Sequence, residues 1–173
     1  MRRPHIKKFS IALISSALAL SLTACGGAGP DAATRLIKRV TDGNEATIKT
    51  NGNDLAISNL LLVATEDGSA VVVGTIVNYA DEADALLGIS VGPTTANISG
   101  EQNLVKNQPI RFEGDSANAK AVFPGVGATP GRHVTVKLAF ARAGVVEVSA
   151  IIRDKRDIYA GVTTGAKLAT EAK

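Results

Sequence analysis

The chain has 173 residues, among them 19 lysines and arginines and 16 aspartates and glutamates, and a formal net charge of +3. Four basic residues and no acidic ones precede Cys25, so residues 25–173 contain fifteen basic and sixteen acidic residues, and the basic balance belongs to the N-terminal segment. Residues 25–173 lack the clustered basic face and the abundant aromatic side chains of a nucleic-acid-binding protein, and the single cysteine excludes an internal disulfide.

The first 24 residues have the pattern of a bacterial lipoprotein signal peptide. A cationic start is followed by an apolar run, residues 11–22, which is too short to span a bilayer, and then by Leu22-Thr23-Ala24-Cys25. This tetrapeptide resembles the lipobox, in which diacylglycerol is attached to the cysteine and the peptide is cut just before it. An ordinary secretory signal with an unrelated cysteine is the alternative.

If Cys25 carries the lipid, the mature protein starts there and is anchored at the outer face of the bacterial cell membrane. Two or three acyl chains, such as palmitate, make the attachment effectively permanent, because each buried methylene contributes roughly 0.8 kcal/mol. We expect no cofactor other than this covalent lipid.

Residues 25–53 are predicted to form a tether and an arm. The glycine-rich stretch 26–30 has few side chains to bury and predicts a flexible tether. The apolar residues of 33–40 have helical spacing, which leaves a basic face that could contact anionic headgroups or a partner. A mobile linker or an extended arm packed on the domain is the alternative, and we favour it because so short a helix is marginal alone. The basic residues of this face are Arg35, Lys38 and Arg39.

Residues 54–154 are predicted to form a β domain. Two apolar runs, 55–64 and 70–79, flank a turn with Asp67-Gly68 and predict a hairpin. Strict alternation in 134–141 and 145–152, joined by Arg142-Ala143-Gly144, predicts a second pair of strands. The remaining expected strands are 86–91, 95–99, 108–113 and 120–123.

About seven short strands in roughly a hundred residues, with turn residues near every tenth position, indicate an all-β fold. We expect an antiparallel β-sandwich of the immunoglobulin-like or cupredoxin-like kind. Residues 155–173 lose the alternation and predict a C-terminal tail, although 158–162 could add an edge strand or dock on a neighbour.

Several segments of this domain resemble the periplasmic copper chaperones of the PCuAC type. The resemblance spans about residues 54–154 and rests on Ile76-Val77-Asn78-Tyr79, on residues 84–90, and on the passage from Pro130-Gly131 through the last two strands. It implies a cupredoxin-like β-sandwich, as the alternation does, and a family whose members hand Cu(I) to respiratory oxidases.

The copper ligands that the resemblance implies are missing. That family holds copper with histidine and methionine residues in two stretches, which correspond here to residues 96–101 and 119–124 and contain no histidine, methionine or cysteine. Cu(I) prefers thioether, thiolate or imidazole donors, and residues 25–173 offer only Cys25 and His133. A scaffold of this type without ligands resembles the LpqE-like lipoproteins of actinobacteria, some of which accompany the cytochrome bcc–oxidase supercomplex.

Other kinds of site have weak support. His133 follows a Pro-Gly turn, where a solvated histidine is expected, and no nucleophile, base and orienting group occur together. The acidic loop Asp81–Asp84 could bind a divalent cation such as Ca²⁺, but a solvated loop is the favoured alternative, because the spacing matches no calcium loop.

The sequence therefore predicts a non-enzymatic, lipid-anchored accessory protein that binds another envelope protein, with no metal site and no nucleic-acid partner. The resemblance makes the respiratory supercomplex the first candidate partner. A copper-delivery protein whose site is completed by its partner is the alternative function. Apart from the basic face, we expect the loop 123–131 to contact the partner, through Phe123 and Val126.

Overall fold

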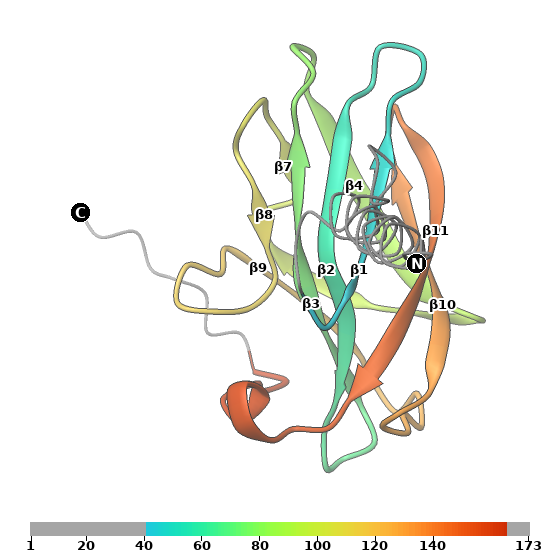
Figure 1. Cartoon of the computed structure of the whole chain (residues 1–173), viewed down its shortest axis with the longest axis vertical. Helices are drawn as coiled ribbons and strands as arrows, with labels where there is room; N and C mark the ends of the chain where they lie inside the picture. Colours follow the sequence, from blue (N-terminus) through green and yellow to red (C-terminus); the bar gives the residue numbers. More distant parts are fainter. Residues whose placement is uncertain (1–40, 166–173) are drawn as a thin grey trace, which may run out of the picture. The chain divides into compact units, whose positions relative to one another are not determined.

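The computed structural model describes residues 41–165 and consists of β-strands with one short 3-10 turn (Figure 1). The all-β fold is therefore confirmed. Both expected pairs of strands form, and the first apolar run is a strand with the expected bounds, Leu55–Ala64. The elements are β1 (Asn44–Ile48), β2 (Leu55–Ala64), β3 (Ala70–Asn78), β4 (Asp84–Val91), β5 (Thr94–Thr95), β6 (Asn97–Gly100), β7 (Asn103–Leu104), β8 (Ile110–Arg111), β9 (Ala119–Phe123), β10 (His133–Phe140), β11 (Gly144–Arg153) and η1 (Asp157–Tyr159).

The strands form a sheet in the order β5-β4-β10-β11-β2-β3-β9-β6, with β1, β7 and β8 paired to β2, β4 and β3. Its two terminal strands, β5 and β6, are separated in the sequence only by Ala96, whose N–H donates to the carbonyl of Ile89 at 2.8 Å. The sheet therefore curls around a core, as a barrel-like β-sandwich. The ladders between strands are antiparallel except for β11 with β2, where Ile152 lies opposite Leu62.

The core consists mainly of aliphatic side chains, which alternate with exposed ones in β10, whereas β2 and β3 are buried on both faces over residues 60–64 and 70–74. In β10, for example, Val136 and Leu138 are fully buried, whereas Thr135 and Lys137 are exposed. Two phenylalanines, Phe112 and Phe123, are also fully buried. Burial of this apolar surface, at roughly 25 cal/mol per Å², is the main source of stability in a domain without a disulfide.

The sheet begins earlier than the sequence pattern predicts, because β1 lies in the segment that we assigned to the arm. Its residues pair with β2 up to Leu60, across a bulge where Asn59 has a φ of 53°. Gly43 makes this approach possible, since its N–H donates to Asn59 Oδ1 at 2.8 Å and a Cβ there would lie 2.4 Å from the Asn59 carbonyl carbon. The extended arm packed on the domain, one of our alternatives, describes residues 44–48.

The segment after β11 also differs from the predicted tail, since residues up to 165 have a defined position. Tyr159 and Val162 are buried against the outer face of β2 and β3, on an apolar cluster that includes Val63 and Val71. Tyr159 donates to Asp42 Oδ2 at 3.1 Å, and Asp42 lies 3.5 Å from Arg153. The segment therefore forms no edge strand and docks on its own sheet.

Residues 41–165 include no helix with the length and apolar character that crossing a bilayer requires.

Candidate functional site

Strands β6 and β9 pair with each other and lie within the two stretches, 96–101 and 119–124, in which the PCuAC-type resemblance implies copper ligands. They pair in antiparallel register, with Ile98 opposite Ala121 and Ser99 opposite Lys120. Ala119 and Ala121 turn into the core, so small apolar side chains fill the inner side of this ladder. The fold thus brings the two stretches together, as the resemblance implies.

The donor atoms on this ladder do not fit Cu(I). The paired residues offer amide, hydroxyl and ammonium groups and no sulfur or imidazole, whereas Cu(I) prefers soft donors. His133 lies at the start of β10, on a different part of the sheet, and is exposed, as we expected of a solvated histidine. Among residues 41–165, no group of three histidine, cysteine, aspartate or glutamate side chains is placed to hold a metal ion.

The prediction that Phe123 contacts a partner is wrong. Its side chain is fully buried, because it ends β9 on the core side of the sheet, opposite Ala70. Val126 is partly buried and packs against the same core. Both apolar side chains therefore pack against the core of the domain and hold the loop on it. The basic residues Arg35, Lys38 and Arg39, and the lipid attachment site Cys25, lie outside the described residues.

The carboxylates of the acidic loop are engaged within the protein and do not converge on a common point. Asp81 is paired with Lys106, and this hydrogen bond holds the pKa of the Asp81 carboxyl below its usual value. Glu82 is paired with Arg142. Asp84 is buried at the start of β4. This arrangement favours the solvated loop, in ion pairs, over the calcium site.

Two buried polar side chains, Asp84 and Asn78, hold the loops at this end of the sandwich, a structural role that the sequence pattern did not indicate. Asp84 accepts hydrogen bonds from three backbone N–H groups, those of Ala85 (2.7 Å), Arg142 (2.8 Å) and Ala143 (3.0 Å), and so fixes the turn between β10 and β11. Asn78 donates to the carbonyls of Glu82 and Leu104 at 2.8 and 2.9 Å. A polar residue at the boundary of an apolar strand is the signal that could have identified both.

A small apolar patch lies on the outer face of β4, β10 and β11. Leu87 and Val145 are each 65% exposed, which is unusual for large aliphatic side chains. Ala139 lies between them, because it pairs with Val145 on one side and with Gly88 on the other. We call Leu87, Ala139 and Val145 the outer patch. The sequence could have suggested it, since one of the adjacent residues Leu86 and Leu87 must point away from the core.

No family model and no curated protein matches the sequence. Solved structures do resemble it. The apo PCuAC domain from PmoF1 is 22% identical, with a TM-score of 0.54, and the match covers 64% of this chain and 99% of that domain. The copper-bound PCuAC domain from PmoF2 is 17% identical, with a TM-score of 0.53, and the match covers 64% and 98%. These similarities show that this chain has the fold of a PCuAC domain.

Proposed function

We propose that this protein is a non-enzymatic, lipid-anchored binding protein of the cell envelope, which attaches to an integral membrane complex from the outer face of the membrane. The signal-peptide pattern of the first 24 residues and the Leu-Thr-Ala-Cys sequence support the proposed lipid anchor. The resemblance stated above makes the cytochrome bcc–oxidase supercomplex the first candidate partner.

The outer patch is the observation that best supports binding to another protein. Leu87 and Val145 project from a rigid sheet on either side of a small residue, and this gives a partner two apolar side chains without a conformational change. Two residues along the same strands from Ala139 and Val145, the paired residues Lys137 and Glu147 form an ion pair of 2.7 Å on the same face. An apolar centre beside a polar margin is typical of a protein–protein contact.

The anchor makes a small contact sufficient. A domain attached to the membrane by a tether stays within the tether's length of the integral membrane complexes, which raises its effective concentration without a new contact. A patch of two large side chains can then maintain association that would be negligible between freely diffusing proteins.

Copper delivery, the alternative function, is less well supported in this chain. The PmoF2 domain holds copper in its solved structure, but the corresponding ladder here, β6 with β9, has no soft donor. A site completed by a partner would have to take all its soft ligands from that partner or from His133, which lies on another strand.

The test is co-purification of tagged, lipidated protein from native membranes in a mild detergent. We expect the wild type to bring down a large membrane complex, and Leu87→Asp with Val145→Asp to lose most of it, because a buried unpaired charge at the contact is costly. Thr135→Asp is the control for added negative charge, since it places one carboxylate at an exposed position of β10 on the same face, outside the outer patch.

Migration of the wild type only as a free monomer on native gels would contradict an accessory role. Equal loss in Thr135→Asp and in the double variant would contradict the outer patch as the contact.

A further inference from the structure

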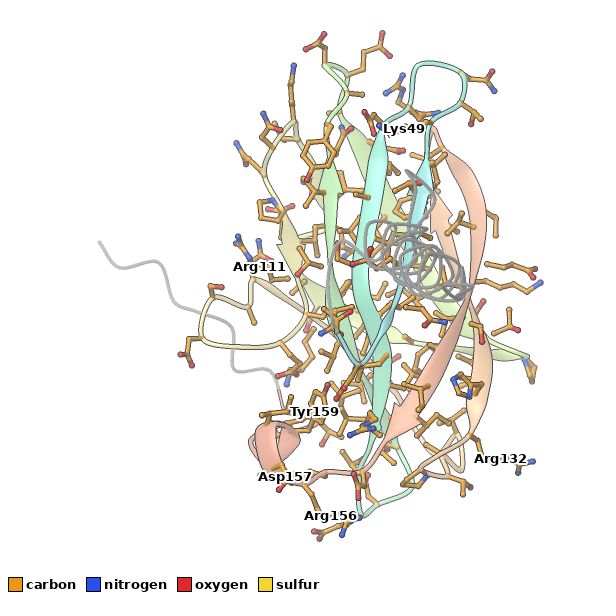
Figure 2. The ribbon with its side chains drawn as sticks, in the orientation of Figure 1. Lys49, Arg111, Arg132, Arg156, Asp157 and Tyr159 are labelled. Carbon is orange, nitrogen blue, oxygen red and sulfur yellow. The ribbon has the colours of Figure 1, made fainter. Side chains whose placement is uncertain are left out.

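Ile158 is the most exposed large apolar side chain in residues 41–165. It is 81% exposed, although Tyr159 beside it is buried against the sheet. Figure 2 shows the neighbouring Arg156 and Asp157, together with Tyr159, at one end of the sandwich. A single exposed aliphatic side chain is ordinary on a protein surface, so its place in the molecule decides whether it has a function.

The segment around Ile158 is held firmly on the sheet. Tyr159 and Val162 are both buried in the apolar cluster on the outer face of β2 and β3. Just beyond them, the carbonyl of Thr163 accepts a hydrogen bond of 2.6 Å from Nζ of the buried Lys120. Ile158 is therefore presented to its surroundings from a fixed position.

The chain that comes from the proposed lipid anchor enters the domain next to Ile158. The hydroxyl of Tyr159, the following residue, donates to Asp42 Oδ2 at 3.1 Å, and Asp42 is the second residue that the structure describes. Thr41 comes 16 residues after Cys25. A flexible chain of that length has an r.m.s. end-to-end distance of roughly 20–24 Å. An anchor at Cys25 therefore keeps this end of the domain close to the lipid headgroups.

The charges around Ile158 are balanced. Residues 153–157 contain three cations and two carboxylates, and Asp42 supplies a third carboxylate. Two of the cations are ion-paired with carboxylates of this group. A surface with a strong net charge gains little from such a segment, whereas a zwitterionic headgroup layer above an apolar interior matches both the balanced charges and the exposed isoleucine.

We propose that residues 155–160 are the surface of the domain that rests on the membrane. Ile158 inserts among the lipid headgroups, and Lys155 and Arg156 contact their phosphates. The proposal rests on the lipid anchor proposed above and goes beyond it, because an anchor alone leaves the orientation of the domain free. It is independent of the outer patch, since Val145 lies near the start of β11 and Arg153, beside this segment, at its end.

The single cysteine of the chain permits a specific label. In the lipidated full chain Cys25 is a thioether, so Ile158→Cys offers the only free thiol. This thiol is labelled with an NBD maleimide, and the protein is reconstituted into phosphatidylcholine vesicles. We expect the emission to shift to shorter wavelength, with quenching by spin-labelled lipids and little quenching by aqueous iodide. Val145→Cys is the matched control, an exposed aliphatic position that should stay open to iodide.

A label at Ala160 tests the contribution of Ile158 itself. Ala160 is exposed in the same segment, so a label at Ala160→Cys should be protected from iodide while Ile158 is intact. In this background Ile158→Asp should abolish the protection, because a carboxylate is costly to bury, and Ile158→Leu should keep it. Protection should be equal with and without phosphatidylglycerol in the vesicles, since insertion of an apolar side chain does not depend on surface charge.

Flotation of the vesicles separates the anchor from the orientation. If the wild type does not float with the vesicles, the anchor is absent and this inference fails together with the proposed function. If it floats while iodide quenches the labels at 158 and 145 equally, only the orientation is overturned, and Ile158 is then free to contact a partner protein. Equal protection in Ile158→Asp and Ile158→Leu, or protection that requires phosphatidylglycerol, would also overturn it.

Discussion

At the scale of single residues, buried polar side chains hold the loops at one end of the sandwich. Asp84 is the clearest case, because one carboxylate accepts from its own strand and from the Arg142-Ala143 turn, 58 and 59 residues away. Hydrogen bonds from backbone N–H groups to a buried carboxylate are strong, and the loss of the carboxylate leaves the donors unpaired.

We therefore expect Asp84→Ala to lower the free energy of unfolding by about 3 kcal/mol. The neighbouring Glu82, whose side chain is 76% exposed in its ion pair with Arg142, is the control. Glu82→Gln should cost less than about 1 kcal/mol, because exposed ion pairs contribute little. Urea denaturation measures both, and equal effects would show that Asp84 has no special role.

The absence of soft donors also leads to a prediction at this scale. The ladder of β6 and β9 has no sulfur or imidazole group, and the chain after Cys25 contains no methionine. We expect the domain to bind Cu(I) no more tightly than an unrelated β domain of equal size in a competition with a chromogenic chelator. A stoichiometric, chelator-resistant Cu(I) complex of the monomer would contradict this.

At the scale of elements, two short segments outside the regular strands complete the domain. The strand β1 joins the sheet through the Asn59 bulge, and the segment with η1 covers an apolar cluster on the outer face. Tyr159 connects the two ends of the described chain, since its hydroxyl donates to Asp42. Burial, together with this bond to Asp42, raises the pKa of Tyr159 to about 12.

This pKa predicts how stability changes at alkaline pH. The folded-state pKa is above the unfolded value of about 10, so folding favours the neutral phenol. Its contribution is complete below about pH 10 and is lost as the pH rises towards about 12. In denaturant titrations, Tyr159→Phe should be less stable than the wild type near neutral pH and should lack this part of the alkaline decline. Tyr79→Phe, a change at an exposed ring, should follow the wild-type curve.

At the scale of the whole molecule, the expected anchor determines where the domain acts. Lipid chains hold a protein by hydrophobic burial, which ionic strength does not screen. We expect the wild type to stay in the membrane fraction through high-salt and carbonate washes, and Cys25→Ala to yield unprocessed or released protein. Fractionation with immunoblotting measures this, and release of the wild type by salt alone would refute the anchor.

The sequence by itself determined the fold class and the main pairs of strands. Alternation in 134–152 has a period of two residues, which only a strand with one buried face satisfies, and the expected strands became β10 and β11. The composition also determined the lack of soft ligands, because donor chemistry depends on which residues are present. The predicted anchor at Cys25 likewise depends on local sequence alone.

Only the tertiary structure decided which side chains face solvent and which distant segments meet. Phe123 lies in a turn-rich segment that suggested a surface loop, yet the last position of β9 turns it into the core. β1 and η1 are too short for periodicity to reveal, and they are held by contacts with residues far along the chain, such as Asn59 and Asp42. The docking of Tyr159 and Val162 on β2 and β3 is likewise a matter of long-range packing, whose energy has no counterpart in the local sequence pattern.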